Sequence, residues 1–263
     1  MKKDSFVEEL TGAALAFGGS SVYSGVSTSR TLMLRELSAL LAGMPADATR
    51  DDYKAAIIED NLLLKPSAST RAKTYSYLRD RFALDPEVPI FNVLRLLWKR
   101  DQPGQPLMTL LVAAFRDPVL RATVPAMIEC EPDQAFPSRE FSQIINAAFP
   151  GKLKEKTLKS TGENMTSTYK QSGHLRGRSL CARQRVNATP GSATLAMLLA
   201  SLSGRSGQAL LASEWVQLLD APGESLLSEV RVAASRGWLE YRHAGDVLDI
   251  TFHQLLEAIG VER

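Results

Sequence analysis

Hydrophobic residues recur at helical spacing along most of the chain, in short runs that end at glycine or proline. The run over 31–42 carries leucine at 32, 34, 37, 40 and 41, and it stops at Gly43-Met44-Pro45. Spacings of three and four residues place side chains on one face of a helix, which Gly and Pro then end. We therefore predict a mainly α, multi-helical protein. Its 263 residues, 44% of them hydrophobic, suffice for about two or three packed units.

The first unit is predicted over 1–86 and contains a helix-turn-helix-like arrangement. Helical patterns over 31–42, 49–61 and 67–84 follow closely on one another, and Thr49-x-x-Asp52 is a capping pattern for the second. A terminal helix rich in basic and hydroxyl side chains is typical of a helix that reads DNA. A three-helix bundle with a solvated basic face is the alternative. The candidate nucleic-acid contacts are Ser69, Thr70, Arg71, Lys73, Tyr77 and Arg79.

A second unit, over 87–187, is predicted to be a helical hub that ends in a basic segment. Between 151 and 187 the chain has nine Lys or Arg and two Glu, so this segment carries +7 and the rest of the chain −5. It is also rich in Ser, Thr, Asn and Gln, whose side chains hydrogen-bond phosphate oxygens. These features predict polyanion binding, with a solvated helix and charged loop as the alternative. The candidate phosphate contacts are Lys152, Lys154, Arg176, Arg178, Arg183 and Arg185.

The third unit, over 188–263, is predicted to be winged-helix-like. Apolar helices over 193–202 and 209–219 precede a helix over 224–236 that ends at Gly237. The segments 238–242 and 247–251 then alternate as strands do, with a turn over 243–246. A helix followed by a hairpin closes a winged helix, but it also closes many domains that bind no nucleic acid.

Catalytic and metal-binding signatures are not found in the sequence. The three histidines are scattered, and His243 is expected in an exposed turn and His174 in the basic segment. There is no phosphate-binding glycine loop, H-E-x-x-H or G-x-S-x-G. Cys130 and Cys181 lack metal-ligand spacing and are too few for a disulfide framework, which favours a reduced cytoplasm. We therefore expect a non-enzymatic, cytoplasmic protein without metal, cofactor or membrane contact.

The order and spacing of several stretches resemble the BrxA family of BREX bacteriophage-exclusion systems, small proteins described as NusB-like. These stretches include Asn61-Leu62-Leu63-Leu64-Lys65 and Ser69-Thr70-Arg71-Ala72-Lys73, together with 23–25, 29–36, 204–219 and 233–239. The resemblance implies a helical, cytoplasmic component of a multi-protein phage-defence system that binds DNA. The NusB-like description would favour RNA instead. The resemblance supports only the 67–82 helix as a site, because the basic segment does not align with the family.

Three functions follow as hypotheses. The first is sequence-tolerant binding of double-stranded DNA by the 68–82 helix and the basic segment. The second is assembly with other BREX proteins, which predicts an exposed apolar surface from the 107–128 helices. The third is RNA binding, for which Tyr77 and Tyr169 are the aromatic residues within basic stretches. The first requires that the cations of both regions converge on one surface.

Overall fold

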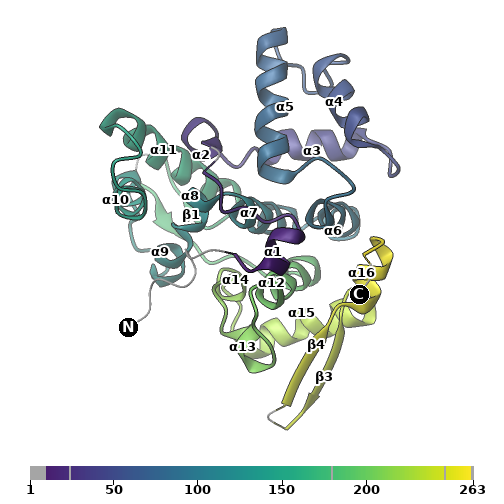
Figure 1. Cartoon of the computed structure of the whole chain (residues 1–263). Helices are drawn as coiled ribbons and strands as arrows, with labels where there is room; N and C mark the ends of the chain where they lie inside the picture. Colours follow the sequence, from purple (N-terminus) through teal and green to yellow (C-terminus); the bar gives the residue numbers. More distant parts are fainter. Residues whose placement is uncertain (1–9, 24, 179, 246, 262–263) are drawn as a thin grey trace.

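The computed structural model describes residues 10–23, 25–178, 180–245 and 247–261. Within these residues the protein is mainly α-helical, with two small two-stranded antiparallel sheets (Figure 1). The predicted mainly α fold is therefore confirmed. Among the described helices, none combines the length and the hydrophobicity that a bilayer crossing requires.

The N-terminal part divides between the body of the molecule and a projecting three-helix unit. Helix α1 (Gly12–Ala16) contacts α12 (Pro190–Leu202), and α2 (Val26–Ser29) packs on α11 (Glu155–Gln171). The unit that projects at the top of Figure 1 consists of α3 (Leu34–Gly43), α4 (Arg50–Ile58) and α5 (Ala68–Phe82).

The three-helix unit has the helix starts that the sequence predicts. The Thr49 hydroxyl accepts from the Asp52 backbone N–H, and the Asp52 carboxylate accepts from the Thr49 N–H at 2.8 Å, which forms a capping box. The Ser67 hydroxyl caps α5 by accepting from the Thr70 backbone N–H at 3.2 Å. The connection between α4 and α5 spans 59–67, which is longer than the roughly three- or four-residue turn of a helix-turn-helix. The structure thus shows three successive helices here, but it does not confirm a helix-turn-helix.

The central part is built around α7 (Gln105–Arg116), whose residues 107–115 are all buried. Proline at the first turn starts several of these helices, where its missing N–H costs no hydrogen bond. Helix α10 (Ser138–Ala148) packs along α11, where Gly162 allows close contact with Ser138 and Ser142. The remaining helices of this part are α6 (Pro89–Trp98), α8 (Pro118–Arg121) and α9 (Val124–Glu129).

The C-terminal part contains the predicted hairpin. Strands β3 (Glu240–Ala244) and β4 (Val247–Thr251) pair antiparallel from Glu240–Thr251 to Ala244–Val247. The first strand begins two residues later than predicted: Trp238 and Leu239 are buried before it, and the Trp238 N–H donates to the Ala233 carbonyl of the preceding helix at 3.0 Å. The helices of this part are α12, α13 (Gln208–Leu211), α14 (Glu214–Gln217), α15 (Gly223–Ser235) and α16 (His253–Ala258).

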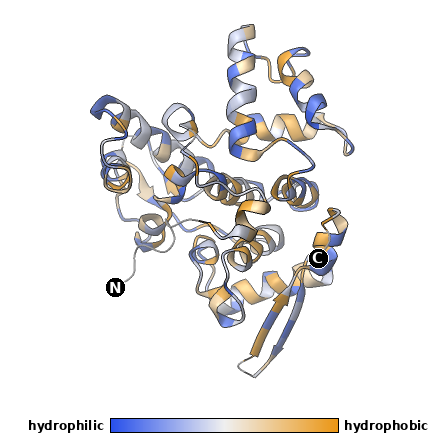
Figure 2. Ribbon diagram, in the orientation of Figure 1, coloured by the Kyte–Doolittle hydropathy of each residue, from blue (hydrophilic) through white to orange (hydrophobic). Residues whose placement is uncertain are grey.

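The basic segment also contains a short hairpin, which the sequence did not predict. Strands β1 (Leu175–Arg176) and β2 (Ala182–Arg183) pair antiparallel, and an isolated bridge joins Ala135 to Ala182. One hydrophobic core runs through all three predicted units, with α7 and α12 at its centre. Figure 2 shows hydrophobic residues concentrated in these central helices and along β4, whereas β3 is mainly hydrophilic.

Candidate nucleic-acid interface

One side of α5 carries Thr70, Lys73 and Tyr77. Successive residues of an α-helix are about 100° apart, so these three lie within about 60° of one another around the axis. Lys73 is exposed, and Thr70 and Tyr77 are half-buried. The Arg30 guanidinium carbon lies 4.6 Å from the centroid of the Tyr77 ring, a cation–π contact. Because Arg30 directly follows α2, this side of α5 faces the connection between α2 and α3.

Arg71 and Arg79, two of the predicted contacts, do not share that side of α5. Arg71 is half-buried on the packing face with Leu78, and its Nε is buried without a hydrogen-bond partner. Arg79 lies about 160° around the axis from Tyr77. Its guanidinium is paired with Asp80 at 2.8 Å and lies over Tyr75 at 5.9 Å.

The hydroxyls predicted to face nucleic acid differ in their local roles. Ser69 is exposed, whereas the Thr70 hydroxyl is 2.9 Å from the Ser67 hydroxyl at the helix cap. Thr70 therefore already has a partner within α5.

Helix α11 borders the same connection from the opposite side. Asn164 donates from Nδ2 to the Ser27 carbonyl at 3.2 Å. Gln171 accepts from the Leu34 N–H at 3.1 Å and donates to the Thr31 hydroxyl at 2.9 Å. The 27–34 segment thus forms a floor between α5 and α11, with polar side chains of α11 fixed against it.

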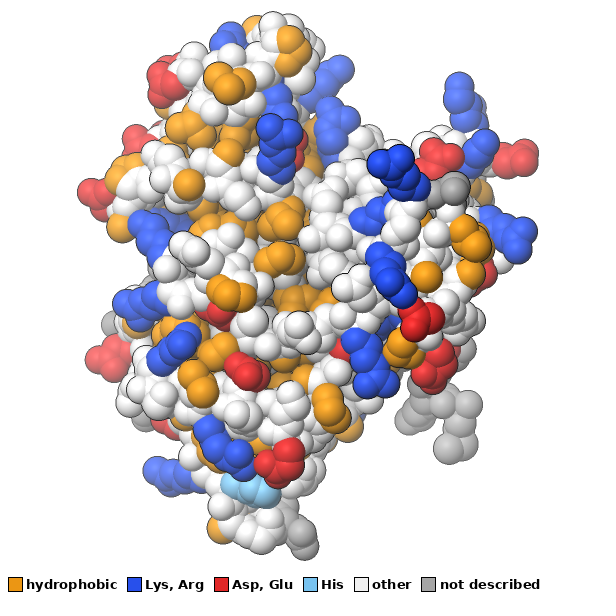
Figure 3. Space-filling model, turned by 180° about the vertical axis from the view of Figure 1, so that it is seen from behind, with side chains coloured by type: hydrophobic (Ala, Val, Ile, Leu, Met, Phe, Trp, Pro, Cys, Tyr) orange, Lys and Arg blue, Asp and Glu red, His pale blue; other side chains and the backbone are white. Residues whose placement is uncertain are grey.

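Basic residues lie on both sides of this floor. Seen from behind, Lys and Arg side chains border a notch between the α3–α5 unit and the lobe of α10 and α11 (Figure 3). On the α11 side, the predicted Lys152 and Lys154 are exposed in the segment before the helix. Four further basic residues lie on the elements that border the notch but were not predicted as contacts: Arg30, Arg35, Lys156 and Lys159. Of these, Arg30 is located at the floor by its contact with Tyr77, which depends on helix packing and is not revealed by sequence spacing.

The 176–185 segment, which includes the β1–β2 hairpin, contributes less positive charge than predicted. Arg178 and Arg185 are exposed, and Arg176 is exposed but paired with Asp133 at 2.5 Å. Arg183 is 2% exposed. The prediction that it contacts phosphate is therefore wrong, because a buried guanidinium cannot reach a phosphate in solvent. It is paired with Asp220 at 2.5 Å and donates from Nε to the Met127 carbonyl at 3.0 Å.

Two further expectations are wrong. Within the 107–128 helices, residues 107–115 and 117–124 are buried and Pro125, Ala126 and Ile128 are half-buried, so these helices do not form the expected exposed apolar surface. Tyr169 is fully buried, so it cannot act as a stacking platform for a base. Burial raises the pKa of its hydroxyl, which lies 3.0 Å from that of Thr123.

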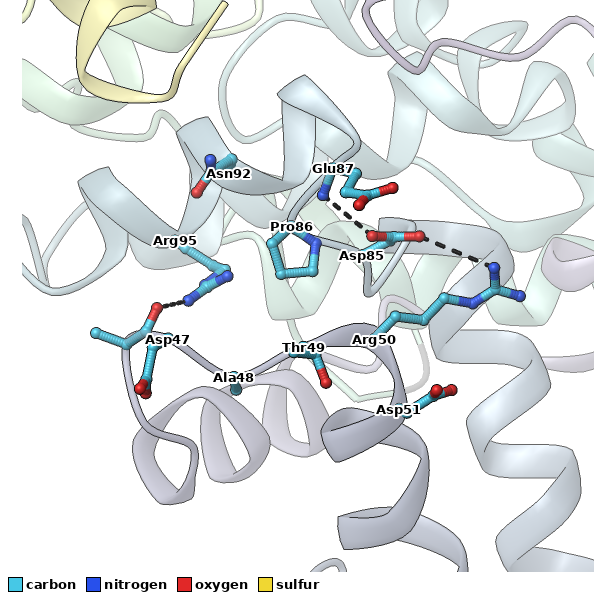
Figure 4. A pocket seen from close by; sticks show the side chains of 11 residues that line it. Asp47, Ala48, Thr49, Arg50, Asp51, Asp85, Pro86, Glu87, Asn92 and Arg95 are labelled. Atoms are coloured by element: carbon cyan, nitrogen blue, oxygen red, sulfur yellow. Dashed lines mark hydrogen bonds and ion pairs between the residues drawn. The ribbon is translucent and has the colours of Figure 1, made fainter.

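A separate cavity of about 580 Å³ lies between the start of α4 and α6 (Figure 4). Its two arginines are both engaged: Arg95 donates to the Ala46 carbonyl, and Arg50 is 4.0 Å from Asp85. Four carboxylates line it, from Asp47, Asp51, Asp85 and Glu87. This negative lining repels phosphate and excludes the cavity from the candidate interface. Within the described residues, no three His, Cys, Asp or Glu side chains are grouped so as to hold a metal ion.

Comparisons with known proteins add no assignment. No protein-family model matches the chain, and no curated protein matches it at a significant level.

Proposed function

We propose that this protein binds double-stranded DNA, without base specificity, across the notch between α5 and α11. The observation that carries the proposal is the presence of Lys and Arg side chains on both sides of the notch (Figure 3). Arg30 and Tyr77 lie between them, in contact with each other. A duplex presents two phosphate strands, so cations on two walls can contact both strands at once.

The charge distribution supports a polyanion as the ligand. The segment 151–187 carries +7 in a chain whose net charge is +2. Its exposed lysines lie before and within α11, next to hydroxyl and amide side chains that can bind phosphate oxygens. The resemblance to the BrxA family supports DNA over other polyanions and suggests a role in phage defence.

Fluorescence anisotropy of a labelled duplex, measured across a salt series, tests the proposal. With about six phosphate contacts, affinity should fall roughly a thousand-fold between about 50 and 200 mM salt. Reversing three notch charges with Arg30→Glu, Lys73→Glu and Lys156→Glu should weaken binding at least about ten-fold and flatten the salt slope. A flat salt response of the unmodified protein would end the proposal.

The matched control reverses three exposed charges elsewhere: Lys99→Glu, Arg100→Glu and Arg205→Glu. Both variants have the same net charge, so a general electrostatic effect would weaken both equally. Equal loss in the two variants would therefore contradict the notch as the site. Competition by duplex RNA and by single strands in the same assay tests RNA binding, and preferential displacement by either would favour it over duplex DNA.

A further inference from the structure

A cluster of buried charge lies beneath the floor of the notch, where α2, α5 and α8 meet. It consists of Arg81, Arg121 and Asp117, each 1% exposed, and is called the guanidinium junction below. Asp117 caps α8 by accepting from the Val119 N–H at 2.9 Å, and it accepts a second hydrogen bond from the Ser27 hydroxyl. Burying three charged groups in one place is costly unless their charges and hydrogen bonds are balanced.

The Arg81 guanidinium has too few partners for a buried group. Its Nη2 is 3.8 Å from the Asp117 carboxylate and donates one long hydrogen bond, 3.4 Å, to the Ser27 hydroxyl. Its Nε and Nη1 are buried and have no acceptor within the described part of the chain. A guanidinium has five N–H donors, and leaving buried donors unpaired is destabilising because their hydration is lost without replacement.

The charges of the junction do not balance either. Arg121 donates to the carbonyls of Ser20, Ala114 and Phe115, which satisfy hydrogen bonds but carry no net charge. Burial lowers the pKa of both Arg81 and Arg121, to about 10 for Arg121, and Asp117 opposes this shift in each case. One carboxylate thus faces two guanidinium groups, which leaves an excess of one positive charge.

A phenol completes the group of unpaired donors. The Tyr23 hydroxyl is buried without a hydrogen-bond partner among the described residues. Burial and the nearby Asp117 charge both raise the pKa of this hydroxyl, so it keeps its proton and can donate. In the sequence, Tyr23 lies between Ser20, whose carbonyl accepts from Arg121, and Ser27, whose hydroxyl donates to Asp117. The chain on either side of Tyr23 is therefore held at the junction.

We propose that the guanidinium junction binds one small monovalent anion of the halide class, held by Arg81 and Tyr23. An acceptor with a negative charge satisfies the free N–H and O–H donors and also cancels the excess charge, whereas water does only the first. The Arg81 side chain is fully enclosed, which favours a monatomic anion over a phosphate or sulfate group. The bound anion connects α2 and α5 to α8. Anion binding at this buried site does not depend on nucleic-acid binding in the notch.

Diffraction from crystals of the unmodified protein transferred into sodium bromide is the direct test. The expected result is an anomalous bromine peak against the Arg81 guanidinium. Ordered water at this position, or no anomalous peak, would overturn the proposal.

Thermal unfolding in chloride and in gluconate, at equal ionic strength, tests the same site in solution. Because the anion binds only the folded state, about 0.2 M chloride should raise Tm on the order of 3–6 °C above gluconate. Tyr23→Phe should lose most of this increment. The matched control is Tyr241→Phe, because the Tyr241 hydroxyl is also buried without a partner but lies in the C-terminal hairpin.

Two results in solution would contradict the proposal. One is the same Tm in chloride and gluconate. The other is an equal chloride response in Tyr23→Phe and Tyr241→Phe. A Tm that is highest in sulfate would instead indicate a general salt effect on the exposed surface, and would equally count against a halide site.

Discussion

Arg183 and Arg185 are two residues apart in the basic segment, yet their environments are opposite. Arg185 is exposed, whereas Arg183 is buried against Asp220 and the backbone carbonyls of Met127 and Gln184. The Asp220 carboxylate also accepts from the Val186 N–H at 3.0 Å. The ion pair therefore fastens the basic segment to the connection between α14 and α15, which is a structural role for a residue predicted to bind phosphate.

Arg183→Met should lower the free energy of unfolding by about 3–5 kcal/mol, because Asp220 would stay largely buried without its counter-charge. Arg185→Met should change it by less than about 0.5 kcal/mol, as exposed substitutions usually do. Urea denaturation of both variants measures the difference. Similar stabilities would show that the Arg183–Asp220 pair does not hold the segment in place.

His174 joins two elements that are far apart in the sequence. It follows α11, and its Nε2 lies 2.9 Å from the Leu218 carbonyl at the end of α14, while Nδ1 lies 2.9 Å from the Ser172 hydroxyl. The ring is fully buried, although His174 belongs to the basic segment. Burial first, and then the Arg183 charge, lower the pKa of His174 to about 4. The neutral ring donates to Leu218 and accepts from Ser172.

The depressed pKa of His174 predicts that acid loosens this contact between α11 and α14. An unfolded histidine titrates near its ordinary value of 6.5, so the unfolded chain binds more protons between about pH 6.5 and 4. The stabilisation is therefore complete above pH 6.5 and is lost as the pH falls towards 4, by on the order of 3 kcal/mol.

Urea denaturation of the unmodified protein and of His174→Gln, between pH 7.5 and 4.5, measures this effect. The His174→Gln variant should be less stable at pH 7.5 but lose less stability towards acid. His243→Gln is the control, since His243 is exposed on β3. Parallel pH profiles for the unmodified protein and His174→Gln would refute the assignment.

At the scale of the whole molecule, α7 and α12 connect the parts that the sequence suggests are separate. Helix α7 contacts α5, α6 and α11 as well as α12, and α12 also contacts α1, α14 and α15. A buried side chain in α7 therefore supports the three-helix unit and the C-terminal part at once. Truncating such a side chain should therefore destabilise both parts.

Leu110→Ala should lower stability by about 2–5 kcal/mol through lost burial and a residual cavity, since Leu110 is fully buried in α7. Hydrogen exchange should then accelerate by the same free energy in peptides from α5 and from α12. Leu64→Ala is the control, because Leu64 is 87% exposed. Acceleration in only one of the two helices would show that the N-terminal and C-terminal parts open independently.

The elements that sequence predicts well depend on neighbouring residues. The Thr49–Asp52 capping box, the Ser67 cap and the C-terminal hairpin each follow from residues a few positions apart, whose contacts are set by local backbone geometry. The apolar spacing of the central helices likewise predicts their buried faces. The candidate site is harder, because it is formed by segments more than a hundred residues apart, such as Thr31 and Gln171.

Residue type alone also misleads within the basic segment. A count of charges treats Arg178 and Arg183 alike, but one is exposed and the other buried. Arg30 was not a candidate, because no local pattern marks it; its position over Tyr77 follows from the packing of α2 between α5 and α11. Which face of α5 is free was equally undecided until its contacts with α2, α4 and α7 were known.

The sequence by itself determined that the chain is mainly helical, where many of its helices begin, and that its positive charge is concentrated between 151 and 187. These properties depend on backbone preferences and on composition, which are local. Tertiary structure alone decided which cations reach solvent, which are paired with carboxylates, and that Arg81 and Arg121 share one carboxylate in the interior. Burial and charge balance depend on all the surrounding groups, and only the folded chain brings those groups together.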